Sequence, residues 1–417
     1  MFLSTLASKP TVMIRLIFST IAGTFFLCAT FIALLTVPFF QNQGIYLNSI
    51  RLTWFQDVAV PEQWGFMHNQ VTPFTLQTPD GEILHAWHIL PLGLYLLYET
   101  ELLDEPSGIV PDVTKSLGFK ILREDPEALL VLYFHGAAGT LGSGWRPPSY
   151  RAMSATSPNK IHTIAIDYRG FGASTGRPTE EGLLLDALTL AEFALKDANI
   201  PPSRIAIFGQ SLGTAVGISL AHHMATRPTN PILFSGMVLV APFADVELLI
   251  ASYRVAGMIP LLDPLARFPR LMALLNSYIL SRWPSKDKLA EYLRHIEAGK
   301  RGDEAKYHIE IIHAEDDYDI PWSHSDKVFW HAVNATSHVG TSFEDLETYK
   351  LDARRDMGAG GWVVECFTQR GLVREEIVKY GLHDRIMSYP VVSRAVSRAL
   401  RVEVLSGTVI AHDPDCH

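Results

Sequence analysis

The feature that most constrains the fold is the pentapeptide Gly209-Gln210-Ser211-Leu212-Gly213 together with its flanks. Before it, Arg204 is followed by the apolar, isoleucine-rich residues 205–208, which predict a buried strand. Residues 214–218 are small and apolar and predict the start of a helix. A strand, G-x-S-x-G and a helix form a nucleophile elbow, a strained turn that raises the serine hydroxyl above a sheet. We expect Ser211 to be a nucleophile and the amide of Leu212 to face a developing oxyanion.

A second match to the same pattern is Gly172-Ala173-Ser174-Thr175-Gly176. It is followed by Arg177-Pro178, and proline there breaks the immediate transition into a helix that an elbow requires. The pattern therefore predicts that Ser174 is a loop residue.

Composition sets the scale of the fold. The 417 residues suffice for one large α/β domain with an insertion, or for two domains. With 48% hydrophobic and 19% charged residues the chain can build a sizeable core. A net charge of −9 gives no reason to expect nucleic acid as a partner, and three cysteines rule out a disulfide scaffold.

The N-terminal region contains a long uncharged segment, residues 16–40. It has about 25 apolar or small residues, where about 20 suffice to span a bilayer. We expect a transmembrane signal anchor there, after a cytoplasmic N-terminus at 1–15. A cleaved signal peptide is the alternative, but no small-residue cleavage site is evident before Gln41. A buried core helix is disfavoured by the length and by the terminal position.

The orientation of the anchor follows from nearby charges. Lys9 and Arg15 precede the span and Arg51 follows it, a slight bias toward a cytoplasmic N-terminus and a lumenal catalytic domain. Asn334-Ala335-Thr336 is a glycosylation sequon that would be usable only on the lumenal side. We expect Asn334 to be the glycosylation site.

The rest of the chain alternates strand and helix patterns. After a linker at 41–73, residues 74–78 and 83–90 predict a hairpin, and residues 91–125 an irregular surface excursion. Further strands are expected at 129–134, 163–166, 205–208, 237–240 and 309–312, and helices at 179–197 and 391–401. This βαβ order predicts an α/β fold with a mostly parallel central sheet, helices on both faces, and ligands at the carboxyl ends of the strands.

An insertion at about 246–306 interrupts the βαβ series. Its middle is dense in leucine, methionine, phenylalanine and tryptophan, which predicts a helical cap over the site. An ordinary core-packed helical pair would have the same composition, and both interpretations can hold.

A serine nucleophile needs a histidine base and an acid that orients it. In elbow proteins the chain order is serine, acid, histidine, so the acid should follow the strand after the insertion. Four carboxylates lie there, at Glu315, Asp316, Asp317 and Asp319. A solvated acidic turn explains three of them. We expect Asp317 to be the acid, with Asp316 as the second candidate.

The histidine should come later still. His383 follows the strand-like residues 362–367 and precedes the final predicted helix, so it is the expected base. The 15 or so residues that separate it from that strand are unusual for such a site. The other histidines lie too soon after the acid or in polar loops and the tail: His324, His331, His338, His412 and His417.

An oxyanion hole needs a second amide, usually from the loop after an earlier strand. His135-Gly136-Ala137-Ala138-Gly139 directly follows the strand at 129–134. Its glycines would let the backbone approach a substrate carbonyl, and we expect the amide of Ala137 to be the donor.

Together these motifs resemble the α/β-hydrolase superfamily. They are the His135 loop, the run Asp167-Tyr168-Arg169-Gly170-Phe171-Gly172, the elbow and His313-Ala314-Glu315-Asp316-Asp317 with Ile320-Pro321. The chain is most similar to the membrane-anchored branch of abhydrolase domain-containing protein twelve, from about residue 74 to 400. That resemblance implies a monoacylglycerol or lysophosphatidylserine lipase facing the lumen of the endoplasmic reticulum, with Asp317 as triad acid and His383 as base.

The sequence therefore predicts a membrane-tethered serine hydrolase, with residues 74–417 as its catalytic domain. The expected substrate is a single-chain acylglycerol or lysophospholipid, since Arg267, Arg270 and Arg282 are interleaved with the apolar cap residues and could meet lipid phosphates. No metal or organic cofactor is expected. A peptidase or thioesterase on the same fold, or a non-catalytic binding protein, are the alternatives.

Overall fold

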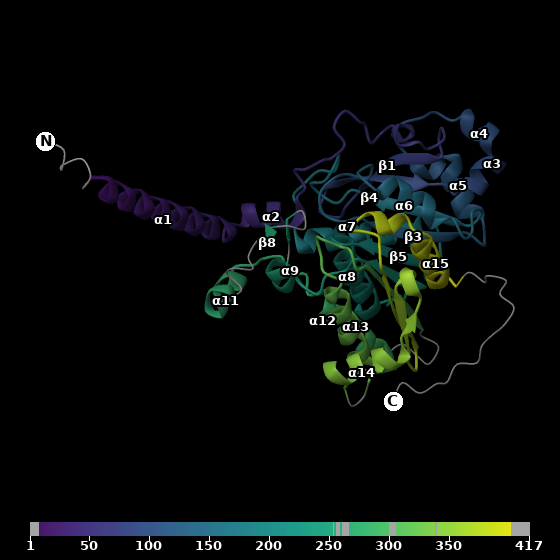
Figure 1. Cartoon of the computed structure of the whole chain (residues 1–417). Coiled ribbons are helices and arrows are strands. Elements are labelled where there is room, and N and C mark those ends of the chain that lie inside the picture. The colour runs from purple at the N-terminus through teal and green to yellow at the C-terminus, as the bar shows by residue number, and fades with distance from the viewer. Residues whose placement is uncertain are drawn as a thin grey trace.

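A single mixed sheet forms the centre of the molecule (Figure 1). The computed structural model describes residues 8–252, 254–255, 259–260, 267–299, 306–337 and 340–401. Over these residues the sheet has ten strands in the order β1-β2-β4-β3-β5-β6-β9-β12-β11-β10. The six strands from β4 to β12 are parallel, and the pairs at both edges are antiparallel. The predicted mostly parallel sheet is confirmed.

The strands of this sheet agree with most of the sequence predictions. They are β1 (Val71–Gln77), β2 (Ile83–Ile89), β3 (Leu129–Phe134), β4 (Ile161–Ile166), β5 (Ile205–Gln210), β6 (Gly236–Val240), β9 (Tyr307–Ala314), β10 (Arg355–Asp356), β11 (Trp362–Phe367) and β12 (Gly371–Val378). The predicted hairpin is β1 and β2, with Phe74 opposite Ala86. The βα pattern was readable because the central strands are continuous apolar runs.

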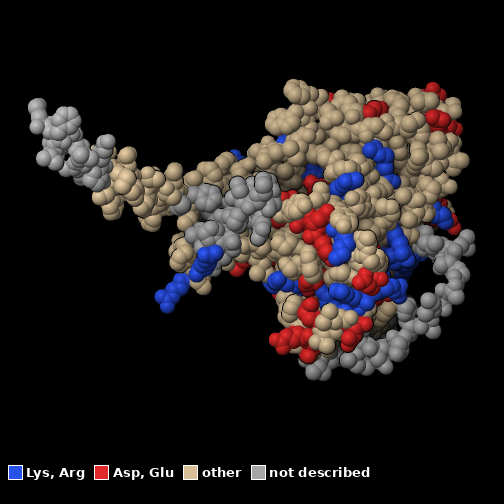
Figure 2. All heavy atoms as spheres, viewed as in Figure 1, with Lys and Arg blue, Asp and Glu red and all other residues tan. Residues whose placement is uncertain are grey.

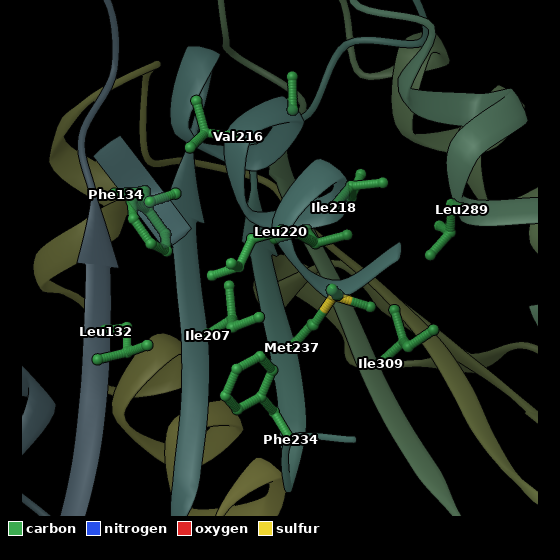
Figure 3. Close-up of a cluster of buried hydrophobic side chains, with 14 of the residues drawn as sticks. Leu132, Phe134, Ile207, Val216, Ile218, Leu220, Phe234, Met237, Leu289 and Ile309 are labelled. Atoms are coloured by element: carbon green, nitrogen blue, oxygen red, sulfur yellow. The ribbon is translucent and has the colours of Figure 1, made fainter. Parts of the chain in front are cut away.

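Helices cover both faces of the sheet. The main ones are α5 (Leu117–Glu124), α6 (Arg146–Met153), α7 (Glu180–Lys196), α8 (Leu212–Thr226), α12 (Ser285–Glu297), α13 (Ser323–Thr336), α14 (Phe343–Ala353) and α15 (Pro390–Ala399). Successive residues of β5 point to opposite faces: Ile207 packs with α7, α8 and α12, whereas Ala206 and Phe208 pack with α6 and α15. Figure 3 shows the first of these cores, with Ile207, Val216 and Ile309 packed between strands and helices.

Two predictions about connecting segments were wrong. Residues 91–125 are not irregular, because they form α3 (Leu92–Leu97), α4 (Glu99–Leu103) and α5, each of which buries part of its apolar side chains. The second error concerns β12, which the sequence analysis missed. The buried residues of this strand include charged ones. Arg374, Glu375 and Glu376 form buried ion pairs in the fold. A strand that buries paired charges lacks the apolar pattern by which strands are recognised.

The N-terminal region is one long helix followed by a short one. The first, α1 (Ser8–Leu35), extends away from the body of the molecule (Figure 1). Of the described helices it alone is long and apolar enough to cross a membrane, over Val12–Leu34, with a mean hydropathy of 2.0 and no buried residue. The helix ends before the predicted boundary at residue 40, because Pro38 cannot continue it and instead begins α2 (Pro38–Tyr46).

Residues 41–73, expected as a linker, are packed on the domain instead. Tyr46 is fully buried, and the side chain of Gln41 is also buried. These side chains find hydrogen-bond partners on the insertion, so ordering the segment is compensated by contacts that a linker would not make.

The insertion at 246–306 divides into two parts. Its second half, α12, packs on α8 and α13 through Leu289, Leu293 and Ile296 and belongs to the core. Its first half contains α9 (Val246–Ser252), a two-stranded pair β7 (Arg254–Val255) and β8 (Ile259–Pro260), and α11 (Pro269–Ser277). Residues 253, 256–258, 261–266 and 300–305 of the predicted insertion lie outside the described residues.

Candidate active site

The elbow serine sits at the carboxyl end of β5. Ser211 has φ 51° and ψ −119°, a backbone conformation that a non-glycine residue adopts only under strain. A Cβ at Gly209 would lie 2.4 Å from the carbonyl oxygen of Gly213, and a Cβ at Gly213 would lie 1.9 Å from that of Phe134. Both glycines are therefore required for steric reasons, and β5, Ser211 and α8 form the strand–turn–helix that the sequence predicts.

The loop after β3 lies directly against this serine. A Cβ added to Gly136 would come within 3.2 Å of the Cβ of Ser211, so only glycine permits so close an approach. The amides of Ala138 and Gly139 donate to the carbonyl oxygens of Tyr46 and Ile50. The amides of Ala137 and Leu212, by contrast, donate to no acceptor among the described residues, and both residues line the same cavity as Ser211.

A buried arginine orients the loop from the opposite side. The guanidinium of Arg146, at the start of α6, donates to the carbonyl oxygens of Gly136, Ala137, Ala138 and Thr140 at 2.6–3.2 Å. With these carbonyls turned toward the guanidinium, their peptide N–H groups face the other way. Sequence reasoning missed Arg146, because only the folded chain brings α6 beneath this loop.

The acid and the histidine meet at the ends of β9 and β12. Asp317 Oδ2 accepts a hydrogen bond of 2.7 Å from His383 Nδ1. Asp317 Oδ1 accepts two more from the amides of Asp319 and Ile320, each 2.9 Å long. Burial opposes the ionised form, but the pKa of Asp317 stays below its usual range because His383 and His313 donate to the carboxylate. Burial likewise opposes the charge on His383, but the adjacent Asp317 raises the pKa of His383 to about 9.

A second histidine completes the environment of the acid. His313 is fully buried, and its Nε2 lies 3.0 Å from Asp317 Oδ2 and 2.9 Å from the carbonyl oxygen of Ile320. Since both neighbours are acceptors, Nε2 carries the proton, and Nδ1 faces the hydroxyl of Ser325 at 2.7 Å. His313 thus orients the acid and has no access to the cavity.

Asp316, the second candidate for the acid, has a different place. Its Oδ1 accepts from the amides of Gly381 and Leu382, each at 2.8 Å, and so holds the backbone just before His383. Gln210 of the elbow holds the other side, because its Nε2 donates to the carbonyl oxygen of His383 and to Asp384 Oδ1. Asp316 and Asp317 therefore contact the same loop: Asp316 binds its backbone and Asp317 binds the imidazole of His383.

The remaining candidates lie elsewhere. The Ser174 hydroxyl donates to the carbonyl oxygen of Asp167 and accepts from the amide of His85, so Ser174 is a loop residue, as its context predicted. His324 and His331 are on α13, where His324 bonds to Ser252 and His331 faces Asp287. The alternatives His338, His412 and His417 lie outside the described residues. Asn334 is at the end of α13, half-buried, and its Oδ1 accepts from the Thr341 amide at 2.7 Å.

A cavity of about 320 Å³ opens over these groups. Ser211 and His383 line it together with Ala137, Leu212 and Asp319. Its other walls are mostly apolar and come from α2, α9, α11 and the residues just after α11, including Phe40, Ile45, Leu249, Met272, Leu275 and Ile279. The volume and the few polar groups at one end are typical of a site for a small, largely apolar ligand.

The same groups do not form a good metal site. Among the described residues, Asp317, Asp319 and His383 have ligand atoms within 4.8 Å of one another. However, Asp317 already accepts hydrogen bonds from His383, from His313 and from two backbone amides. Its lone pairs are occupied by donors, so the cluster is better suited to orienting an imidazole than to binding a cation.

Comparisons with known proteins agree with this architecture. The sequence model of the alpha/beta hydrolase family matches residues 131–322. The crystal structure of an alpha-beta hydrolase from Vibrio vulnificus superposes with a TM-score of 0.51 and 16% identity, over 88% of this chain and 94% of that one. At that identity the likeness shows the fold alone. The fold, the elbow and the family match define the class: the chain has the fold of the α/β-hydrolase superfamily.

Within that superfamily the chain resembles the ABHD12 branch. It is 27% identical to the lysophosphatidylserine lipase ABHD12 of Danio rerio over 306 residues, which is 73% of this chain and 69% of that protein. The ABHD12 of Xenopus tropicalis is 30% identical over 215 residues, about half of each chain. Protein ABHD12B of Homo sapiens is 26% identical over 70% of this chain and 69% of its own length.

Proposed function

We propose that this chain is a membrane-anchored serine hydrolase that cleaves the carboxylic ester of a single-chain lipid, a monoacylglycerol or a lysophospholipid. The observation that carries the proposal is the convergence on one apolar cavity of Ser211, the Asp317-bound imidazole of His383, and two amides without acceptors among the described residues. The relatives named as lysophosphatidylserine lipases support the lipid class.

The proposed reaction proceeds through an acyl-enzyme. Ser211 Oγ attacks the ester carbonyl carbon while its proton passes to His383 Nε2, and the carbonyl electrons move onto the oxygen. The amides of Ala137 and Leu212 stabilise that oxyanion, and Asp317 stabilises the imidazolium. His383 then protonates the departing alcohol. Water, deprotonated by the same imidazole, releases the fatty acid and restores Ser211.

The membrane part of the proposal rests on α1. Its Val12–Leu34 segment is long and apolar enough to span a bilayer, with Arg15 near its start as the one charged residue, and Figure 2 shows no charged side chain on its visible face. From α1 the chain passes directly into α2, which lines the cavity, so an anchored enzyme would have its site beside the bilayer surface. We further propose the endoplasmic reticulum as the membrane, with a lumenal domain.

The test is the pair of variants Ser211→Ala and Ser174→Ala, assayed in the full-length protein in membranes. Ser211→Ala should abolish both fluorophosphonate labelling and hydrolysis of lysophosphatidylserine or monoacylglycerol, because losing a triad member costs several orders of magnitude in rate. Ser174→Ala should retain both. The nucleophile assignment is wrong if Ser174→Ala is the inactive variant. Labelling of the wild type without hydrolysis of either lipid would instead refute the substrate class and point to a peptide or thioester.

A further inference from the structure

The helix that follows the predicted membrane span forms a wall of the active-site cavity. Phe40, Gln41, Gly44 and Ile45 of α2 all line that cavity. Their spacing places them on one side of the helix, because residues three and four apart share a face. Figure 1 shows α2 lying between α1 and the body of the molecule. One face of α2 therefore lines the same cavity as Ser211.

Side-chain hydrogen bonds attach α2 to the first half of the insertion. The amide of Gln41 donates to the carbonyl oxygen of Tyr278 at 2.8 Å and accepts from the amide of Leu280 at 3.2 Å. The hydroxyl of Tyr46 donates to Ser281 Oγ at 2.9 Å. Since Gln41 and Tyr46 are both buried, these contacts are shielded from water, and together they hold α2 against the residues that follow α11.

The same segment also holds the loop that carries Ala137. The carbonyl oxygens of Tyr46 and Ile50 accept from the amides of Ala138 and Gly139 at 2.8 and 2.6 Å. A further pair of contacts ties Ser143 to the carbonyl oxygen of Arg51 and Thr140 to Thr53. The two amides after Ala137 are thus used by residues 46–50, while the Ala137 amide is left facing the cavity.

From these contacts we infer that two parts of the segment 38–53 belong to the active site: the cavity-lining face of α2 and the backbone at Tyr46 and Ile50. The face of α2 with Phe40 and Gly44 binds the acyl chain of the substrate. Tyr46 and Ile50 are positioning residues for the oxyanion loop, which is the loop at residues 135–139 after β3. The ligand is a single acyl chain that enters between α2 and α11 from the bilayer in which α1 is embedded. This inference rests on the proposed function, since it assigns a second role to the segment that follows the proposed anchor.

Gly44 offers a direct test of the acyl-binding wall. An added Cβ there meets no atom within 4 Å, so a larger side chain fits without displacing the helix and would occupy cavity space. In Gly44→Leu we expect a lower ratio of kcat/KM for a long-chain monoacylglycerol to kcat/KM for an acetyl ester. The ratio should fall about tenfold, which is typical of a substrate that fits a hydrophobic pocket badly by one methylene group. The matched control is Gln43→Leu, on the same helix but not lining the cavity, which should keep the wild-type ratio. An unchanged ratio in Gly44→Leu overturns the acyl-binding role.

The positioning role is tested at Tyr46 with the acetyl ester alone. Tyr46→Ala removes the buried ring that fixes the position of the residue 46 carbonyl, and it should lower kcat at least tenfold with little change in KM, because oxyanion stabilisation acts on the transition state. Tyr46→Phe keeps the ring and should recover most of kcat. Thermal unfolding of both variants in detergent separates misfolding from misplacement: a folded Tyr46→Ala with wild-type kcat overturns this role. If wild type hydrolyses acetyl esters but no lipid in the same membranes, the proposed function fails instead.

Discussion

Asp317 and His383 are 66 positions apart in the chain, and a hydrogen bond of 2.7 Å joins Oδ2 of the first to Nδ1 of the second. The two residues follow β9 and β12, which are parallel neighbours in the sheet, so their carboxyl ends meet at the same edge. The bond leaves His383 Nε2 as the nitrogen available on the cavity side. It also determines how the site should respond to pH and to substitutions nearby.

The first prediction concerns the pH dependence of hydrolysis. A general base works only when neutral, and the pKa of His383 is about 9, so kcat/KM should rise as the pH rises through that value. Asp319 is one of the carboxylates that raise this pKa. Asp319→Asn should therefore move the midpoint to lower pH, as measured with a neutral ester. Glu315→Gln is the control, because Glu315 pairs with Lys379 and does not line the cavity. A midpoint that moves upward in Asp319→Asn would contradict the assignment.

The second prediction separates the two adjacent carboxylates. Asp317→Asn loses the charge that stabilises the imidazolium and should lower kcat about a thousandfold or more. Asp316→Ala frees the amides of Gly381 and Leu382 and should lower kcat about tenfold by loosening the His383 loop. Asp316→Asn, which retains an acceptor oxygen, should be close to wild type. If Asp316→Asn were the more damaging of the two asparagine variants, the acid would be Asp316.

Arg146 is the subject of the third prediction. Lysine keeps the charge but lacks the forked donors that bind several carbonyl oxygens at once. Arg146→Lys should lower kcat by about 10- to 100-fold with a smaller effect on KM, within the range for losing an oxyanion donor. Arg151→Lys is the matched control on α6, because Arg151 contacts the Trp64 carbonyl and the Phe66 ring instead. Equal losses in both variants would mean that α6 has only a general structural role.

Fourth, the exposed side of α11 should contact the bilayer. Leu275 is buried and lines the cavity, whereas Leu274 on the same helix is 53% exposed. A glutamate at position 274 should weaken docking to an apolar surface. In Leu274→Glu the ratio of long-chain lipid hydrolysis in vesicles to acetyl-ester hydrolysis should fall severalfold. Leu351→Glu, at an exposed leucine on α14, should leave that ratio unchanged. Identical ratios would argue against lipid contact by α11.

Topology is the last prediction. With Lys9 and Arg15 ahead of the span, the catalytic domain should be lumenal and protected from protease in sealed microsomes. Asn334 should then carry a glycan that is removed by a glycosidase and is absent in Asn334→Gln. Attachment at Nδ2 leaves Oδ1 free to keep its hydrogen bond from the Thr341 amide. Digestion of the domain without detergent would reverse the orientation.

Much of the fold could be predicted because its signals are local. The strand, turn and helix around Ser211 lie within about twenty residues, and each has its own apolar pattern. The same holds for α1, whose composition alone predicts a span. The site residues Asp317 and His383 were expected from chain order, and the structure places their side chains in contact. The interval between β11 and His383, which was unusually long for such a site, contains β12. Buried charged residues in β12 interrupt the apolar pattern by which a strand is recognised in a sequence.

By itself, the sequence determined the elbow, the parallel strands and the apolar N-terminal helix, since each depends on the periodicity of neighbouring residues. Only the tertiary structure decided which carboxylate holds His383, that Arg146 gathers four carbonyl oxygens of the oxyanion loop, and that α2 walls the cavity. These relationships join atoms from segments far apart in the chain. Their partners are selected by the distance and direction of hydrogen bonds in the folded state, which leave no periodic trace in the sequence.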